Sequence, residues 1–532
     1  MSDLTITRRH ALLAGLGATA ASCATSEAAG AARFDHGVAA GDPRADSVVI
    51  WTRATPAREG VRAVPLTWII AEDPALEHVV ASGAARAVAA NDYCAKVDVS
   101  GLAPGRAYHY GFFAGETASP VGRLTTLPAG AVDQVKLAVF SCSNYPFGRF
   151  HAYADMAARA ASDDITAALH LGDYFYESGG RGGWGYETGE AMGRAHDPAH
   201  EIITLEDYRR RYRQYRTDPD LQAAHAAVSW ILTWDDHEFA NNPWMHGAQN
   251  HNEGEGSWED RKAAALRSYF EWMPIRDPEP GRARDAIWRN FAFGDLLTLA
   301  MLETRLTGRD EQLDYGRDLG WVETAYYTGD PDRPEVITDP SLLHPTPPPD
   351  VETLRTPFDV SGDEPQAILD YDSAKLVDPA NLPDNIEYRR DVEAFLARLE
   401  DPDRRMIDPA QEEWLIDTVR ASHEAGVRWQ VLGNQIIFAH QALFDFAEHY
   451  PAATIAAMEE DPYIAGRLEL GRYGLPGNMD AWDGYPAQRD RIAAAFSAAG
   501  AHPVILTGDT HLFWANEVRD PSGARCAAEF GT

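Results

Sequence analysis

Five predicted strands end in polar residues of the kinds that bind metal ions, and this pattern limits the possible folds more than any other feature. The apolar runs at 135–140, 165–171, 228–234, 427–432 and 504–507 are typical of buried strands. Helical patterns, such as those at 151–161 and 205–215, lie between them, and this alternation favours a layered α/β or α+β core. Sites in such folds form beyond the carboxyl ends of strands, so we expect the five strand ends to meet.

The residues that follow these strands combine sulfur, nitrogen and oxygen donors. They are Ser141-Cys142-Ser143-Asn144, Gly172-Asp173-Tyr174-Phe175-Tyr176, Asp235-Asp236-His237-Glu238, Gly433-Asn434-Gln435 and Gly508-Asp509-Thr510-His511. Thiolate, phenolate, carboxylate and imidazole together suit ferric iron, whereas the oxygen donors that remain suit calcium. Phosphate ester hydrolysis needs charge neutralisation and an activated water, which two metals about 4 Å apart can supply. Asp173 is the natural bridging carboxylate.

Each motif has an ordinary alternative when it is taken alone. A Gly-Asp pair after a strand is typical of a turn, and Cys142 has the character of a small core residue. One of Asp235 and Asp236 could cap a helix, and Asn434 could be a loop amide. The order of the motifs at successive strand ends is what favours a metal site.

The five motifs together resemble those of the PhoD-type alkaline phosphatases, a family of calcineurin-like metallophosphoesterases. The segments Phe34-Asp35-His36-Gly37-Val38-Ala39 and Trp51-Thr52-Arg53 are similar to the N-terminal β-domain of that family. The resemblance implies an α+β fold, in which an N-terminal β-sandwich domain precedes a two-sheet β-sandwich core flanked by helices. It also implies one ferric ion and calcium, with phosphomonoester or phosphodiester substrates. The family usually continues well past the final Glu529-Phe530-Gly531-Thr532 motif, into a segment near the site.

The resemblance also implies a ligand set. The ferric site would use Cys142, Asp173, Tyr176 and His511, and the calcium site would use Asp173, Asp236, Asn434 and Asp509, with Asp173 bridging. His237 would protonate the leaving group or bind phosphate, unless it only supports a ligand by hydrogen bonding. Arg305 and Arg309 are candidate phosphate partners, with surface salt bridges as the alternative.

The chain divides into three parts by composition. Residues 1–32 form a predicted export signal, 34–128 a predicted β-sandwich domain and 135–532 the predicted catalytic domain. Strand-like runs at 47–52, 66–70, 95–99 and 108–113 support the second assignment. Residues of about 310–405 are rich in Pro and Asp, which indicates a surface insertion with little periodicity.

The N-terminus has the pattern of a twin-arginine export signal. Arg8 and Arg9 precede a short stretch of small and apolar residues at 11–21, which is too short to span a membrane. We therefore expect recognition by the twin-arginine translocation machinery and a periplasmic or secreted protein. A disordered basic tail and a lipoprotein anchor at Cys23 are weaker alternatives. Three cysteines remain beyond the signal, so the mature chain has an unpaired thiol, which a metal ligand at Cys142 would explain.

The net charge of −34 argues against nucleic acid as a partner, and no run of 18 apolar residues predicts a transmembrane helix. The preferred interpretation is a metal-dependent phosphomonoesterase. A phosphodiesterase with phospholipase D-like activity would use the same metal core. A scaffold protein with a vestigial site belongs to a different class. A mononuclear zinc hydrolase would need His-Glu-x-x-His or Cys-x-x-Cys spacing, which the sequence lacks.

Overall fold

The computed structural model describes residues 32–330, 332–338 and 348–532, and it shows a mixed α/β fold. The chain divides into two compact units. Unit 1 contains the described residues up to Glu311, together with Arg405–His440 and Gln488–Thr532, and unit 2 contains Gln312–Arg404 and Gln441–Ala487. Residues 1–31 of the predicted export signal, including Cys23, lie outside the described residues.

The first sheet of unit 1 joins strands from the N-terminal segment to strands of the predicted catalytic domain. Its order is β11 (Leu137–Phe140), β12 (Ala167–His170), β13 (Ser229–Leu232), β2 (Val38–Gly41), β3 (Ser47–Arg53) and β7 (Cys94–Ser100). β11, β12, β13 and β2 run parallel, and β3 and β7 continue the sheet in antiparallel pairing. Trp230 of β13 pairs with Gly41 of β2, so the N-terminal segment shares a sheet with the strands that precede the metal-type motifs.

The second sheet of unit 1 carries the remaining two motifs. Its order is β16 (Arg289–Phe293), β17 (Leu297–Met301), β24 (Trp429–Gly433), β25 (Val504–Thr507), β27 (Arg525–Gly531) and β26 (Trp514–Arg519). The four inner strands are parallel, and both edge strands are antiparallel to their neighbours. The two sheets pack on each other through buried apolar residues that include Leu169, Ile231, Leu299 and Val431. Strands were therefore predicted correctly at all five motif positions.

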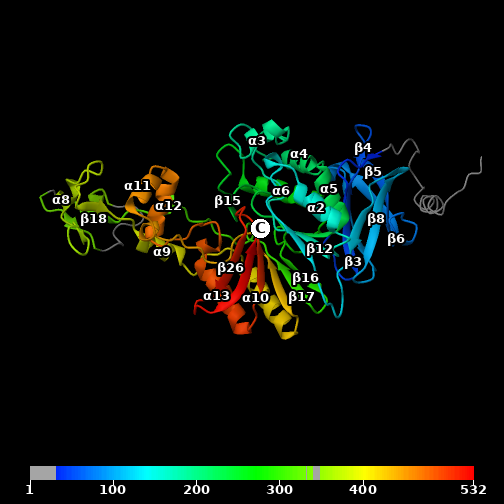
Figure 1. The fold of residues 1–532 in the computed structure, drawn as a ribbon. Helices are drawn as coiled ribbons and strands as arrows, with labels where there is room; N and C mark the ends of the chain where they lie inside the picture. The colour runs from blue at the N-terminus through cyan, green and yellow to red at the C-terminus, as the bar shows by residue number, and fades with distance from the viewer. Residues whose placement is uncertain (1–31, 331, 339–347) are drawn as a thin grey trace, which may run out of the picture. The chain divides into compact units, whose positions relative to one another are not determined.

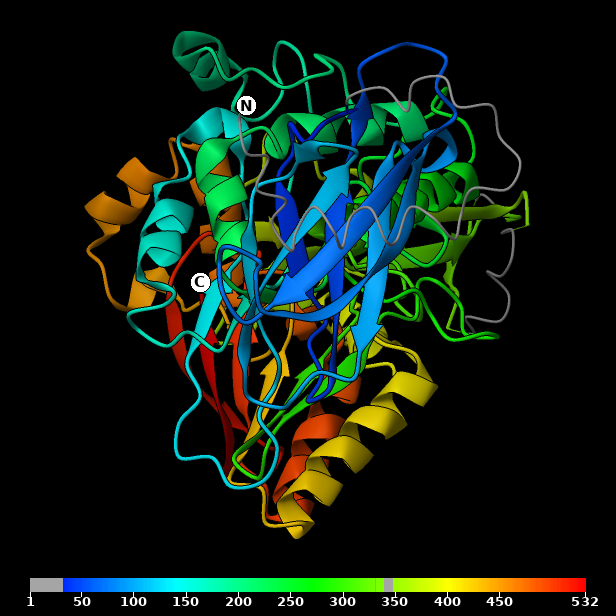
Figure 2. The same ribbon diagram turned by 90° about the vertical axis from the view of Figure 1, so that its right-hand side faces the viewer.

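The N-terminal segment also forms a third sheet of unit 1, whose blue strands β5, β6 and β8 lie beside β3 of the first sheet (Figures 1 and 2). It contains β10 (Gly122–Thr125), β8 (Ala107–Ala114), β5 (Ala63–Ala71) and β6 (Val79–Val88), with β9 (Thr117–Ala118) paired to β8. Ile70 and Tyr110 of this sheet pack against Ile50 and Val99 of the first sheet in one apolar core. The N-terminal segment thus has two layers. One layer is the third sheet, and the other is formed by β2, β3 and β7 at one end of the first sheet.

Helices cover the outer faces of the two central sheets. α2 (His151–Arg159), α4 (Leu205–Tyr215), α5 (Pro219–Ala227) and α6 (Trp258–Trp272) pack on the first sheet through an aromatic core. α10 (Pro409–Glu424) contacts β17 and β24 of the second sheet. α4 begins at the predicted residue, because the Thr204 and Asp207 side chains cap each other's backbone N–H groups.

Unit 2 has more regular structure than its composition suggested. Residues 312–404 contain two three-stranded sheets, ordered β19-β18-β20 and β22-β21-β23, as well as α7 (Tyr315–Asp318), α8 (Tyr371–Lys375) and α9 (Val392–Leu399). The strands are β18 (Glu323–Tyr327), β19 (Glu335–Val336), β20 (Val351–Arg355), β21 (Pro357–Asp359), β22 (Gln366–Ala367) and β23 (Ile386–Tyr388). The sequence shows little periodicity here because these strands are only two to five residues long, so it did not indicate them. α11 (Ala452–Met458) and α12 (Pro462–Arg472) complete the unit, whose core joins Phe395 and Leu399 to Leu475 and Met479.

The described part of the chain contains no helix that is both long enough and apolar enough to cross a membrane.

Candidate metal centre

The strand ends of the two central sheets bring the metal-type side chains together. The ligand atoms fall into three overlapping groups, and within each group they lie within 4.8 Å of one another. The groups are Cys142, Asp173 and His511; Asp173, Asp236 and His237; and Asp235, Asp236 and Asp509. Asp173 and Asp236 each belong to two groups, so the side chains form one continuous cluster.

Four of the clustered residues have left-handed backbone conformations. The φ angles are 56° at Cys142, 56° at Asp173, 67° at Asp509 and 56° at His511. Non-glycine residues rarely adopt such angles, and they gather at functional sites where the surrounding structure enforces them. The short turns after β11, β12 and β25 therefore aim these side chains at one point.

Gly172 lets two of these turns approach each other closely. Its φ is +111°, and a Cβ atom built there would lie 2.3 Å from both the Cβ and the backbone N of Asp235. No other residue type fits this position without separating the β12 turn from the β13 turn.

The first part of the cluster has sulfur, phenol, imidazole and carboxylate groups. Cys142 Sγ and Tyr176 Oη each lie 3.4 Å from Asp173 Oδ2, and Tyr176 Oη lies 2.9 Å from His511 Nε2. Tyr176 and Asp173 are fully buried, whereas His511 is exposed. This part contains the four residues that the resemblance implies for ferric iron.

The second part of the cluster is dominated by carboxylates. Asp236 is buried and its Oδ1 accepts no hydrogen bond among the described residues, although Arg305 Nη2 lies 3.7 Å away. Asn434 directly follows β24, where its backbone N donates to Leu506 O and its side-chain amide donates to Ile436 O. Neither Asp235 nor Asp236 caps a helix, because a turn follows them.

Burial and like charge make the cluster electrostatically unfavourable in the absence of a cation. Burial, and then the nearby Asp236 carboxylate, raise the pKa of Asp173 well above its ordinary value. Burial also raises the pKa of the Cys142 thiol to about 12 and raises the pKa of Tyr176. A bound cation would reverse each of these shifts by favouring the deprotonated form.

His237 is held by a carboxylate that the sequence did not single out. Its Nδ1 lies 2.6 Å from Glu177 Oε2, while Glu177 Oε1 accepts from the backbone N of Asn241 and the side chain of Asn250. Burial opposes the charged form of His237, but Asp236 and Glu177 outweigh it and raise the pKa to about 10. His237 in turn lowers the pKa of Glu177 to about 2 against the effect of burial. The only local signal was the position of Glu177 directly after Tyr176.

Glu238 is a second residue that was not singled out as functional. Its carboxylate accepts backbone hydrogen bonds from Asp173 at 3.1 Å, Tyr174 at 2.6 Å and Asp235 at 2.9 Å. Glu238 therefore fastens the β12 turn to the β13 turn. The sequence signal was its place at the end of the Asp235–Glu238 run.

Arg305 and Arg309 are fully buried, so neither forms a surface salt bridge. Arg305 Nε lies 2.5 Å from Asp235 Oδ1, and its Nη2 lies 3.2 Å from Asp509 Oδ1. Arg309 Nη1 donates to Thr304 O and contacts Met406 Sδ, both at 3.3 Å. Neither arginine is among the side chains that line the cleft beside the cluster.

Two clefts open beside the cluster. A polar cleft of about 520 Å³ is lined by Glu177, Asp236, His237, Asn241, Asp509 and His511, among others. A second cleft of about 570 Å³ is bordered by Cys142, Tyr176, His511 and several aromatic residues. The cluster is therefore open to solvent on two sides.

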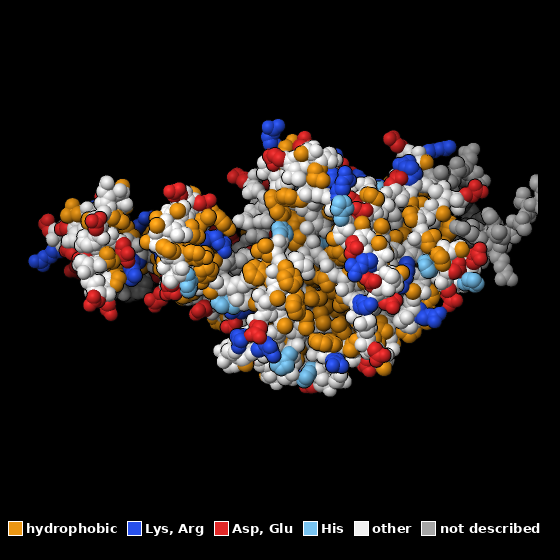
Figure 3. Space-filling model, in the orientation of Figure 1, with side chains coloured by type: hydrophobic (Ala, Val, Ile, Leu, Met, Phe, Trp, Pro, Cys, Tyr) orange, Lys and Arg blue, Asp and Glu red, His pale blue; other side chains and the backbone are white. Residues whose placement is uncertain are grey.

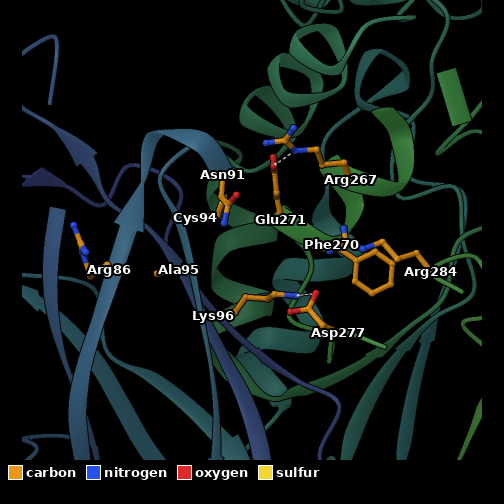
Figure 4. A pocket seen from close by; sticks show the side chains of 10 residues that line it. All are labelled: Arg86, Asn91, Cys94, Ala95, Lys96, Arg267, Phe270, Glu271, Asp277 and Arg284. Carbon is orange, nitrogen blue, oxygen red and sulfur yellow. Dashed lines mark hydrogen bonds and ion pairs between the residues drawn. The ribbon is translucent and has the colours of Figure 1, made fainter. Parts of the chain in front are cut away.

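Another cavity of about 520 Å³ lies between β6, β7 and α6 (Figure 4). Its acidic side chains are already paired: Asp277 lies 3.3 Å from Lys96 Nζ, and Glu271 lies 3.0 Å from Arg267 Nε. None of its residues belongs to a metal-type group in the described part of the chain. The strand ends are consequently the better candidate for chemistry.

Known proteins resemble this chain over most of its length. A family model described as "PhoD-like phosphatase" matches residues 137–532, and one described as "PhoD-like phosphatase, N-terminal domain" matches residues 18–128. The chain is 31% identical over 495 residues to alkaline phosphatase D of Bacillus subtilis (strain 168), which covers 91% of this chain and 65% of that relative. A solved structure described as "Structure of PhoD" is similar with a TM-score of 0.66 and 29% identity, covering 95% of this chain and 78% of the other. The chain thus spans about 65% of the length of the curated relative.

Proposed function

Because the chain belongs to the PhoD-like phosphatase family, we propose that it hydrolyses phosphate esters, phosphomonoesters foremost, at a metal centre on the strand ends. The observation that carries this proposal is the cluster itself, where seven metal-type side chains from four separate turns form overlapping groups within 4.8 Å. A chain without such chemistry would have no physical reason to bury so many like charges together.

The donor set fits the proposed metals. We assign ferric iron to Cys142, Asp173, Tyr176 and His511, because thiolate, phenolate and imidazole favour a transition metal. We assign calcium to Asp173, Asp236, Asn434 and Asp509, which offer oxygen donors. The buried Asp236 Oδ1, which accepts no hydrogen bond within the described residues, is the kind of atom that a cation satisfies. When bound, the metal ions would supply charge neutralisation for the phosphate and an activated water.

The chain's own residues position the substrate and the proton. His237 lines the polar cleft with its Nδ1 held by Glu177, which leaves Nε2 to protonate the leaving oxygen or bind a phosphate oxygen. Arg305 contacts Asp235 and Asp509, so we assign it a positioning role toward the carboxylates. Arg309 lies further back and supports the segment that carries Arg305.

The proposal includes export. The Arg8-Arg9 pair and the stretch of small residues after it support passage through the twin-arginine machinery to the periplasm or the medium. A folded, metal-loaded phosphatase is a suitable cargo for that route. Changing both arginines to lysine should retain the protein in the cytoplasm, which cell fractionation would detect.

Substitution of Asp173 by Asn tests the metal centre directly. Asp164→Asn is a matched control, because Asp164 is exposed and has a φ of 52°, close to the 56° of Asp173. Metal content by elemental analysis, visible absorption, and hydrolysis of p-nitrophenyl phosphate and bis(p-nitrophenyl) phosphate should be measured for both variants. We expect Asp173→Asn alone to lose metal, colour and hydrolysis.

Three outcomes would overturn parts of this proposal. If Asp173→Asn kept its metal and its activity, the assignment of the metal centre to this cluster would be wrong. If the unmodified protein hydrolysed neither ester, a scaffold protein with a vestigial site would be the better description. If the purified protein were colourless and held only zinc, the ferric assignment would be wrong. Faster hydrolysis of the diester than of the monoester would favour the phosphodiesterase alternative within the same metal centre.

A further inference from the structure

The second cleft beside the cluster is lined by six aromatic side chains together with several polar residues. Phe140, Phe147, Phe150, Tyr153, Tyr176 and Trp184 all contribute to a volume of about 570 Å³. Figure 3 shows hydrophobic side chains gathered on this face of unit 1, around the place where Figure 1 marks the C-terminus. Carboxylates, by contrast, dominate the charged lining of the polar cleft. The two clefts therefore differ sharply in the groups that they could accommodate.

Trp184 and His511 line both clefts and mark the boundary between them. The Trp184 ring stacks on the His511 ring with centroids 4.9 Å apart and an interplanar angle of 16°. It also meets the Tyr176 ring edge-on at 5.1 Å. Because Tyr176 and His511 are proposed metal ligands, an aromatic wall begins directly beside the atoms that would hold the phosphate.

The aromatic wall is exposed although it is large and apolar. Trp184 and Phe147 are 46% and 45% exposed, and their rings pack edge-to-face with centroids 4.9 Å apart. Exposed aromatic pairs of this kind are typical of surfaces that receive a ligand. Within the described residues, this exposed face lies beside the proposed phosphate site.

The loop that carries Trp184 is built from glycines. Its sequence is Ser178-Gly179-Gly180-Arg181-Gly182-Gly183-Trp184-Gly185, and it leads into α3 (Tyr186–Met192). Gly179 lies against the backbone of His200, where a Cβ atom would come within 2.5 Å of the carbonyl oxygen. The loop is thus anchored at its start, and it places a bulky ring at its far end.

Asn144 is part of the lining of the same cleft. Its side-chain oxygen and nitrogen are both buried, and neither has a hydrogen-bond partner among the described residues. Ser143, Arg149 and Thr532 also line the cleft, and a largely apolar wall with a few polar groups suits a planar ring that carries polar atoms.

We propose that the aromatic cleft binds the alcohol portion of the phosphate ester and selects esters of planar or aromatic alcohols. In this arrangement the phosphate lies at the cluster, and the ester oxygen lies near the boundary formed by Trp184 and His511. The alcohol then stacks on the wall formed by Trp184 and Phe147. This inference rests on the proposed phosphoesterase function and specifies its substrate class.

The experiment compares two phosphomonoesters in the full-length, metal-loaded protein. One is phenyl phosphate, and the other is a fluoroalkyl phosphate whose leaving alcohol has similar acidity. We expect Trp184→Ala to lower kcat/KM for phenyl phosphate about 10-fold more than for the fluoroalkyl ester, because it removes one ring–ring contact. Trp184→Phe, which keeps a ring, should restore most of the preference.

Trp429→Ala is a matched control, because Trp429 is 47% exposed and begins β24, at the opposite end of the strand from the cluster. It should leave the ratio of the two rates unchanged. Equal losses for both esters in Trp184→Ala would overturn the inference, because they would show only a general disturbance of the site. Unchanged rates for both esters would overturn it as well.

If the proposed phosphoesterase function itself were wrong, the experiment would give a different result. In that case the unmodified, metal-loaded protein would hydrolyse neither ester. Inhibition by phenol gives an independent measurement, since the free alcohol should compete with phenyl phosphate and lose affinity in Trp184→Ala. The lack of any competition by phenol in the unmodified protein would contradict the aromatic subsite.

Discussion

We predict that Gly172→Ala lowers both the stability of the protein and the activity of the metal centre, because it adds crowding as well as backbone strain. The new Cβ atom would lie 2.3 Å from Asp235, whereas ordinary contacts begin at 3.4 Å, so the β12 and β13 turns must move apart by about 1 Å. The φ of +111° adds a strain of about 1–3 kcal/mol. Forcing atoms into a packed region costs about 1–3 kcal/mol more. We therefore expect the free energy of unfolding to fall by about 2–6 kcal/mol.

The effect on activity follows from the same displacement. Asp173 and Asp235 stand on the two turns that must separate, and both belong to the metal-type groups. A misplacement of about 1 Å at a reacting centre can lower the rate about 10²-fold. Urea unfolding, elemental analysis of bound metal, and kcat/KM for p-nitrophenyl phosphate would measure the three consequences.

Gly101→Ala separates backbone strain from crowding. Gly101 has a φ of +82°, and a Cβ atom there would meet no atom within 4 Å. The Gly101→Ala variant should lose about 1–3 kcal/mol of stability through backbone strain alone, and it should keep its metal and its activity. If Gly172→Ala retained full metal and a rate within about 3-fold of the unmodified protein, the argument from crowding between the turns would be refuted.

Three further predictions concern single carboxylates and one buried histidine. Glu238→Gln should lower the free energy of unfolding by about 2–3 kcal/mol, measured by urea, because one amide oxygen cannot replace a carboxylate that accepts three backbone N–H groups. Glu177→Gln should lower kcat about 10- to 100-fold with metal content retained, since the hydrogen bond that orients His237 is weakened. A normal kcat in that variant would exclude an orienting role. His36→Gln should reduce the loss of unfolding free energy at low pH. Burial and then the charges of Arg53, Arg216 and Arg213 lower the pKa of His36 from 6.5 to about 3. The unfolded chain then takes up this proton first, so stability is lost as pH falls from 6.5 towards 3, by up to about 1.4 kcal/mol per pH unit. Urea unfolding at several pH values should show that the free energy of unfolding depends less steeply on pH in His36→Gln. An unchanged dependence on pH would contradict this prediction.

The sequence predicted the strand ends well because their signal is local. Each of the five motifs follows a short apolar run, and an apolar run of four to eight residues is typical of a buried parallel strand. The α4 helix has the predicted bounds of 205–215, and the structure shows that Thr204 and Asp207 form a capping pair at its start. Such features depend on neighbours within about four positions, so a single sequence contains them.

Contacts between distant segments had no comparable signal. The pairing of Trp230 with Gly41, which joins the N-terminal segment to the first sheet, links residues far apart in the chain. Unit 2 is likewise assembled from two separate stretches, of which residues 441–487 were not recognised. No local pattern of hydrophobicity specifies which strand becomes the neighbour of another.

The supporting residues of the site were missed for a related reason. Glu177 lies 60 residues before His237, and their contact depends on two irregular loops. Glu238 stood within a recognised motif, but its role is to accept backbone N–H groups, which the sequence does not display. Ligands can be predicted from residue type, whereas their supports must be found from geometry.

The supports explain how the cluster can exist before a metal arrives. Asp173 has a strained backbone and a carboxylate close to that of Asp236, so repulsion and strain both favour opening the turn. Backbone bonds oppose this opening: Cys142 N donates to Gly172 O at 3.1 Å, and Ser143 N donates to Asp173 O at 2.7 Å. With Glu238 on the other side, the turn is fixed by main-chain contacts that need no cation. Metal binding would then relieve charge repulsion without having to order the loop, which is the arrangement that keeps reorganisation small.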